Sequence, residues 1–305
     1  MRAGGCATLL HCFKKQNKMR LLKTFTKTLL VTLTLFIGLQ SRSFADGGFP
    51  VRPGRLLLAP SVSYFFANSA WDTTGTPAKR YPNNGKYNSV GVTFYGEYGI
   101  SRDWAAVVSL PFVYNSFTQN VAPTSTISSG VTDLETGIRY YLANINYIYY
   151  FSLQGTAITP LYHNDPSLGY GEEGAELKLA VSGSGNMFDR SVYFNASDGF
   201  RQYFGTNGPW QNRYSATFGI TLDPEFLNQV SVTGSGIFSQ STDKTFSPVL
   251  EANKDYSFFE LSLSYGHTFT DEISLFATAG KFLTGYNTSA GTIFSLAFVY
   301  RLDYK

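Results

Sequence analysis

The sequence has few of the residues that build metal sites, disulfides and thiol active sites. Only two of its 305 residues are cysteines and three are histidines. Both cysteines, Cys6 and Cys12, lie in an N-terminal region that we expect to be removed, so the remaining chain has no disulfide framework and no cysteine zinc site. The two remaining histidines are far apart and lack the ligand spacing of a zinc site. We therefore predict neither a metal nor another cofactor.

Long apolar runs are also missing, because no stretch after residue 45 is apolar for 18 residues, and this excludes a helical membrane protein. The most apolar segment, 29–37, follows a basic segment and precedes Ser43-Phe44-Ala45, which is the pattern of a cleaved signal peptide. It is too short to cross a bilayer as a helix, which takes roughly 20 residues. We predict that residues 1–45 are a removed leader, with Met19 the better initiator, and that residues 46–305 form one domain.

The basic balance of the whole chain comes from this leader. It holds eight of the 24 basic residues and none of the 21 acidic ones, so the mature chain is mildly acidic. No basic patch remains that would indicate nucleic-acid binding, and we predict no nucleic-acid partner.

Period-two alternation dominates the rest of the sequence and places every second side chain on one face of a strand. The pattern is clearest near the C-terminus, where Phe294, Leu296 and Phe298 alternate with smaller residues. The segments that we interpret as strands lie at 56–66, 90–98, 106–114, 134–142, 147–153, 175–181, 191–202, 214–222, 229–239, 259–265, 273–283 and 294–304.

The connections between these segments alternate in length. Longer polar ones lie at 67–86, 118–130, 159–173, 203–211, 241–256 and 284–291, and shorter ones at 101–103, 143–146, 184–187, 223–225 and 270–272. Long outer loops, short periplasmic turns and an even number of strands are typical of outer-membrane barrels. The fold class that we predict is all-β, a transmembrane antiparallel up-and-down β-barrel of about 12 strands.

A secreted β-sandwich also alternates, so strand length and aromatic content have to separate the two. Sandwich strands average about five or six residues, whereas these segments reach about ten, as membrane strands do. Aromatic residues fall at strand ends, where lipid headgroups would lie. Those that we expect in such a belt are Tyr64, Phe66, Tyr98, Tyr114, Tyr140 and Tyr147.

The last strand resembles the terminal signal by which outer-membrane proteins are recognised for insertion. Its Gly291 is followed by alternating aromatic residues, although the chain ends on Lys305 rather than on an aromatic residue. We therefore expect the barrel-assembly machinery and outer-membrane lipid as partners, and the bacterial outer membrane as the location.

One segment carries a family resemblance. Residues 129–142, which read Ser-Gly-Val-Thr-Asp-Leu-Glu-Thr-Gly-Ile-Arg-Tyr-Tyr-Leu, resemble a strand of the outer-membrane protein family of the meta-pathway of phenol degradation. The segments 54–66 and 104–111 are similar to that family too. The resemblance covers nearly all of residues 50–305 and implies a transporter-like barrel linked to the uptake of aromatic compounds.

If the apolar faces meet lipid, the opposite faces line the lumen and carry charges of both signs. The residues that we expect there, as a candidate solute path, are Glu97, Asp133, Glu135, Arg139, Glu176, Lys178, Arg213, Glu260, Tyr95, Tyr141 and Tyr193. Buried charges need partners or water. They therefore form either a plug of ion pairs or the wall of a narrow passage, and strand number alone does not decide between the two.

The function that we predict is a channel for small solutes, with hydrophobic or aromatic compounds as favoured cargo on the resemblance alone. Two alternatives stay open, an adhesive or structural barrel that acts through its outer loops and a membrane-embedded lipid hydrolase. We predict no enzyme, because neither His163 nor His267 lies near a recognisable nucleophile motif.

Overall fold

The computed structural model describes residues 49–75, 78–162, 167–247 and 253–303. The leader and its cleavage site, both cysteines, His163 and the last two residues lie outside these ranges, so the predictions made for them remain predictions.

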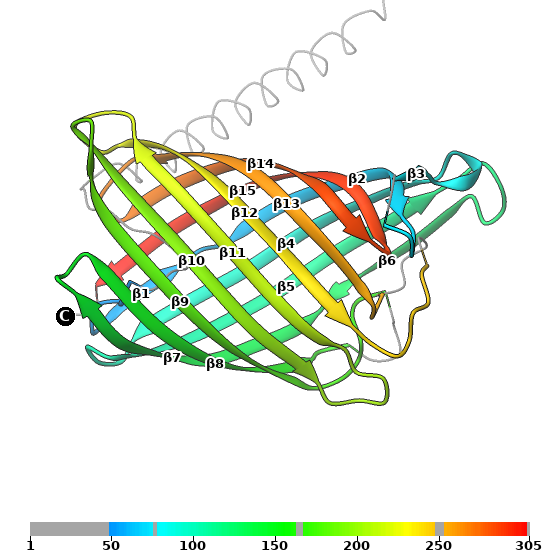
Figure 1. Cartoon of the computed structure of the whole chain (residues 1–305), viewed down its shortest axis with the longest axis horizontal. Helices are drawn as coiled ribbons and strands as arrows, with labels where there is room; N and C mark the ends of the chain where they lie inside the picture. Colours follow the sequence, from blue (N-terminus) through cyan, green and yellow to red (C-terminus); the bar gives the residue numbers. More distant parts are fainter. Residues whose placement is uncertain (1–48, 76–77, 163–166, 248–252, 304–305) are drawn as a thin grey trace, which may run out of the picture. The chain divides into compact units, whose positions relative to one another are not determined.

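The described chain is almost entirely β-structure (Figure 1). Its strands are β1 (Arg55–Leu58), β2 (Ser61–Trp71), β3 (Lys79–Arg80), β4 (Lys86–Gly99), β5 (Trp104–Thr118), β6 (Ser125–Val131), β7 (Asp133–Ile145), β8 (Tyr149–Pro160), β9 (Gly174–Met187), β10 (Arg190–Tyr203), β11 (Trp210–Thr221), β12 (Asn228–Gln240), β13 (Tyr256–Thr268), β14 (Ile273–Tyr286) and β15 (Thr288–Asp303). The helical structure within the described ranges is one short 3₁₀ turn, η1 (Pro82–Asn84). None of the described residues belongs to a helix that is long and apolar enough to cross a membrane.

These strands form one sheet that closes on itself. Strands β1 and β2 together make a single barrel strand, because both pair with β15 on one side and with β4 on the other. Strands β6 and β7 likewise share β5 as a neighbour, and β3 is a short addition within the first outer connection. The result is a closed antiparallel barrel of 12 strands, which confirms the predicted fold class.

The seam between the first and last strands is reinforced by an ion pair. The guanidinium of Arg55 donates hydrogen bonds of 2.5 and 2.7 Å to the two carboxylate oxygens of Asp303. The ladder continues across the break at Pro60, because the Phe298 amide donates to the Pro60 carbonyl at 2.9 Å. The first and last strands are therefore hydrogen-bonded to each other along the seam, which is what a sheet in lipid requires.

The two faces of the strands differ as the alternation predicts. Large apolar side chains such as Phe94, Leu177 and Leu263 point away from the barrel with exposed fractions of 60%, 57% and 59%. Small polar side chains such as Ser182 and Ser274 point inward and are buried. This arrangement is inside-out relative to a soluble protein and suits a polar lumen within lipid.

Aromatic side chains gather at both ends of the outer surface. Tyr98 lies near the end that carries the short turns, as do Trp104 and Tyr140, whose rings contact each other at a tilt of 43° with 4.5 Å between their centroids. Tyr64, Phe66 and Tyr114 lie near the other end, where the longer loops are, and are also exposed. The six belt residues thus face outward, although Tyr147 lies in a turn rather than in a strand.

Several predicted boundaries are wrong, and backbone geometry gives the reason. The turn expected at 184–187 lies at Phe188 and Asp189, and the one expected at 143–146 begins at Asn146 and includes Tyr147; all four residues have positive φ, as tight hairpin turns require. The outer loop expected at 284–291 is a single residue, Asn287, with φ of 52°.

The predicted loop at 118–130 is also wrong in part. Strand β6 occupies residues 125–131 and continues the pairing with β5 that β7 begins. Polar side chains mark this segment as loop-like in the sequence. They are tolerated in a strand here because the strand ends rise beyond the apolar band toward water.

A substitution on the outer surface tests whether that surface meets lipid. Leu263 lies near the middle of β13, and Leu263→Arg should lower the free energy of unfolding in bilayers by about 2–4 kcal/mol, because a lipid-buried cation is costly. The same change at Leu222, which follows the periplasmic end of β11, should cost only about 0–1 kcal/mol. Equal losses for both variants, measured by denaturant titration in liposomes, would argue against a membrane-embedded barrel.

Candidate functional site

All of the residues predicted to line the lumen have side chains on the inward face of their strands. These are Tyr95, Glu97, Asp133, Glu135, Arg139, Tyr141, Glu176, Lys178, Tyr193, Arg213 and Glu260. They do not form one site. The structure brings five of them into two clusters at different heights, Tyr95, Glu97 and Arg139 in one and Glu135 and Glu176 in the other, and each cluster contains a further residue that sequence reasoning missed.

The cluster nearer the periplasmic end is built around Arg139. Its Nη1 lies 3.0 Å from both carboxylate oxygens of Glu97, and its Nη2 and Nε donate to Oε1 of Gln154 at 2.9 and 3.1 Å. Tyr95 adds a hydrogen bond of 3.0 Å to Glu97. Arg139 and Glu97 are 5% and 2% exposed, so the two charges are withdrawn from water and depend on one another.

The cluster nearer the outer end is built around Arg201, which the sequence analysis did not select. Its Nη2 lies 2.6 Å from Oε1 of Glu135, and its Nε lies 2.7 Å from Oε2 of Glu176. Arg201 is 3% exposed. One guanidinium therefore ties β10 to β9 and also reaches β7, two strands beyond β9 on the same wall, and so holds two predicted carboxylates in one network.

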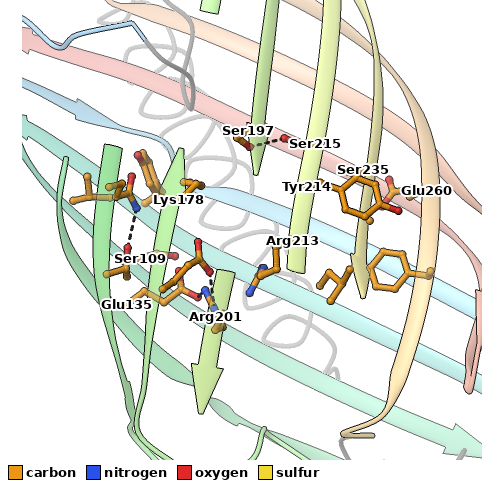
Figure 2. A pocket seen from close by; sticks show the side chains of 18 residues that line it. Ser109, Glu135, Lys178, Ser197, Arg201, Arg213, Tyr214, Ser215, Ser235 and Glu260 are labelled. Carbon is orange, nitrogen blue, oxygen red and sulfur yellow. Dashed lines mark hydrogen bonds and ion pairs between the residues drawn. The ribbon is translucent and has the colours of Figure 1, made fainter. Parts of the chain in front are cut away.

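Two cavities lie in the lumen and meet at this network. The lower cavity has a volume of about 370 Å³, and Lys178, Arg213 and Glu260 are among the residues that line it (Figure 2). The upper cavity, also about 370 Å³, lies under the outer loops. Glu135 and Arg201 line both cavities, so their ion pair stands between the two spaces.

The walls of the lower cavity differ in chemistry from one side to the other. Strands β7, β9, β10 and β11 contribute most of the charged side chains, and β13 adds Glu260. Strands β12 and β13 contribute Ile237 and Phe258, and Phe258 stacks on Phe282 with 4.2 Å between ring centroids and 5° between planes. Phe65 contacts Phe282 in turn at 5.1 Å. The cavity is thus densely charged on one side, whereas the other side presents an aromatic surface beside the single carboxyl of Glu260.

Small hydroxyl side chains pair along the inner wall of β10 to β14. Ser197 and Ser215 are hydrogen-bonded at 2.9 Å (Figure 2). Thr217 with Thr233, and Ser264 with Thr278, form equivalent pairs at 2.8 and 2.7 Å. Because these side chains are short and already satisfied, this wall leaves room in the lumen without a desolvation penalty.

An outer loop covers the upper cavity. Residues 167–173 fold inward, where Tyr170 accepts a hydrogen bond from Gln211 at 3.2 Å and packs edge-on against Tyr203 at 4.8 Å. Tyr162, at the start of the same connection, accepts a hydrogen bond from the Gly171 amide at 2.9 Å. Burial raises the pKa of Tyr162 well above its ordinary value, and the nearby Asp133 carboxylate raises this pKa further, so the phenol stays neutral.

The N-terminal segment fills the periplasmic end. The Phe49 ring packs against the inward-facing Tyr150 at 5.2 Å, and residues 49–51 lie beside Glu97 and Arg139 with only about 10 Å³ of free space. The segment passes so close to Gly99 that a Cβ there would lie 2.2 Å from the Arg52 carbonyl oxygen. Glycine at this position is therefore required for the segment to enter the barrel.

The remaining histidine of the described chain lies away from the lumen. His267 faces outward near the periplasmic end of β13, where its Nδ1 is 2.7 Å from Oδ1 of Asn228 and its ring packs edge-on against Phe269. Within the described ranges, no group of three His, Cys, Asp or Glu residues is placed to hold a metal ion.

Comparison with known proteins identifies the fold and no family. No protein-family model matches the chain, and no curated protein matches its sequence. The chain is similar to the COG4313 outer membrane channel from Pseudomonas putida F1, with a TM-score of 0.63 and 10% identity over 86% of this chain and 100% of that one. The resemblance to the phenol-degradation family therefore stays a prediction.

Two other barrels are more distant. The translocator domain of the autotransporter NalP from Neisseria meningitidis has a TM-score of 0.43 at 11% identity, covering 94% of this chain and 98% of that one. The CymD monoaromatic hydrocarbon channel also has a TM-score of 0.43, at 9% identity over 83% and 90% of the two chains. At such identities the comparisons establish a barrel of the outer-membrane type and nothing finer.

The buried ion pair of Arg139 and Glu97 leads to a prediction about stability. Arg139→Met leaves the Glu97 carboxylate buried without its cation and should lower the free energy of unfolding by about 3–5 kcal/mol. Adding Glu97→Leu removes the stranded charge and should recover most of that loss. Denaturant titration in liposomes measures both; a double variant no more stable than Arg139→Met would show that the two charges do not depend on each other.

Proposed function

We propose that this protein is a passive channel for small solutes in the bacterial outer membrane. The observation that carries the proposal is the pair of cavities separated by Glu135 and Arg201 inside a closed barrel. The barrier between these two cavities consists of ion pairs. Water and a polar solute can replace the partners of a charged group, so such a barrier opens at modest cost.

The cavity supports a more specific cargo. A solute that carries an anionic or polar group beside an aromatic or apolar portion would meet Arg213 and Lys178 on one side and Phe258 on the other. We therefore propose amphipathic aromatic compounds, such as aromatic carboxylates, as favoured cargo. Purely hydrophobic solutes suit this lining less well, because they would desolvate the charged wall without compensation.

The two alternatives have weaker support. An adhesive barrel would present its outer loops to the medium, but residues 167–173 fold into the lumen. A lipid hydrolase would need a histidine beside a nucleophile, and His267 does face the outside of the barrel. Its Nδ1 is hydrogen-bonded to Asn228, however, and within the described chain it has no hydrogen bond to a nucleophilic side chain. The leader and the assembly machinery belong to the proposal as the route by which the chain reaches the outer membrane.

Conductance in planar bilayers tests the channel and its barrier together. Arg201→Ser removes the guanidinium between the cavities and should raise the single-channel conductance above that of the wild-type protein, because the two spaces would join and residues 49–51 would remain as the other constriction. It should also shift ion selectivity toward cations, because Glu135 and Glu176 would lose their counter-charge.

Arg102→Ser is the matched control, because Arg102 is exposed on a periplasmic turn outside both cavities, and this variant should conduct as the wild type does. If wild type and Arg201→Ser insert reproducibly but neither conducts ions nor admits solutes into liposomes, the channel proposal is wrong. If both conduct equally, the channel stands and the ion-pair barrier is wrong.

Cargo preference can be read from block of the ion current. Benzoate should reduce the current of the wild-type protein more than acetate or benzyl alcohol does at the same concentration, because only benzoate engages both the charged wall and the aromatic wall of the cavity. Phe258→Ala should weaken block by benzoate by about fivefold and leave block by acetate unchanged. Equal block by the three compounds would contradict the amphipathic cargo.

A further inference from the structure

A groove lies on the outer surface of the barrel, on the lipid-facing side near the end that carries the longer loops. It has a volume of about 620 Å³ and runs across β14, β15, β2 and β4 below the first outer connection. The ladder is irregular on either side of it, with register shifts at Ser289/Gly291 and at Phe259/Glu260. These irregularities bend the sheet locally, which gives the surface its concavity.

The floor of the groove is apolar and its edges are cationic. Phe66 and Leu283 turn outward with 40% and 47% exposure, whereas Lys86 and Lys281 flank them and are exposed as well. Among the described residues that line the groove, none is acidic. Within the described chain neither lysine has a carboxylate partner, in contrast to nearby Lys79, which lies 2.5 Å from Oδ2 of Asp72.

Register fixes the spacing of the two lysines. Lys281 pairs with Thr292, Thr292 with Phe66, and Phe66 with Asn88. Lys86 lies two residues from Asn88 on the same face of β4. Three strand spacings across the sheet, about 14 Å, and a two-residue offset along it, about 7 Å, therefore place the two lysine backbones about 16 Å apart. Near the interface an exposed lysine is tolerated, and two such cations on one groove are available to anionic headgroups.

We propose that this groove binds a diphosphorylated glycolipid of the lipid A type in the outer leaflet. One phosphate lies against Lys281 and the other against Lys86, at opposite ends of the disaccharide. An acyl chain lies over Phe66 and Leu283, and Asn88 and Thr292 face the sugar hydroxyls between the phosphates. The proposal depends on the barrel being in the outer membrane and is independent of whether the lumen conducts.

A phospholipid with a single phosphate fits the same groove less well. Because the two backbones are about 16 Å apart, the two ammonium groups can share one phosphate only if both side chains extend flat toward each other over Phe66 and Thr292. In other side-chain conformations the second lysine would remain uncompensated at the lipid boundary. The arrangement therefore predicts discrimination by the number of phosphates rather than by acyl chains alone.

The test is lipid titration of the purified full-length mature barrel in detergent micelles, followed by native mass spectrometry. Diphosphoryl lipid A should bind at least tenfold more tightly than monophosphoryl lipid A or phosphatidylglycerol. Lys281→Gln and Lys86→Gln should each weaken binding of diphosphoryl lipid A about tenfold and reduce the preference over the monophosphoryl form. Raised ionic strength should weaken wild-type binding in the same direction.

Arg102→Gln is the control, since it removes an exposed cation from the opposite, periplasmic rim, and it should bind lipid A as the wild type does. Circular dichroism and heat-modifiable gel migration establish that each variant is folded. Folded lysine variants that bind diphosphoryl lipid A with wild-type affinity would overturn the proposal, and so would equal binding of phosphatidylglycerol by the wild type. The lysine variants should have the single-channel conductance of the wild type, so that a failure of lipid binding and a failure of the channel proposal can be told apart.

Discussion

The constraint on which this structure depends is that lipid offers no hydrogen-bond partner to the backbone. A sheet in that environment has to close, and the pairing of β1 and β2 with β15 closes this one. The seam is also where the ladder is least regular, with a break at Pro60 and a bulge near Gly291. The Arg55–Asp303 ion pair lies at its periplasmic end, where water weakens such a pair but geometry is bidentate.

Closure then dictates what the interior can contain. Once apolar side chains face lipid, the inward positions hold polar groups, and each large one has to find a partner across the lumen. Arg139 and Arg201 solve this at two heights, each with carboxylates that come from other strands. Between and above them, the short hydroxyl side chains on β10 to β14 leave space. The lumen is consequently divided into layers, and charged layers alternate with cavities.

The sequence predicts the faces of the strands better than it predicts contacts across the lumen. Alternation alone assigns Glu97 and Arg139 to the inside, because parity is a local property. That these two residues form a pair depends on barrel closure and strand tilt, which bring together residues 42 positions apart. Arg201 was missed because its segment alternates weakly: Asp198 occupies a lipid-facing position there, held by Asn212 at 2.7 Å.

The alternation pattern also does not predict the exact turn positions or the placement of the N-terminal segment, because both depend on tertiary geometry. Phe188 and Asp189 adopt positive φ because the hairpin demands it, although neither is a residue that favours that conformation strongly enough to mark the turn. Phe49 lies inside the barrel end and contacts Tyr150, about a hundred residues away, and sequence periodicity does not predict such a contact. Local sequence therefore fixes which way a residue points, and tertiary geometry fixes what it meets.

A lumen closed by ion pairs is a suitable starting state for a channel, for an energetic reason. The attraction within a buried pair is largely offset by the loss of hydration of its two charges, so the net stabilisation is small. When water or a charged solute enters beside Arg201, it restores hydration while it weakens the pair, and the two changes compensate one another. An apolar plug has no such compensation, because wetting it only costs free energy. Charged layers can therefore exclude solutes at rest and still yield to one that offers a replacement partner, which makes the side chains around Arg201 both the barrier and the recognition surface.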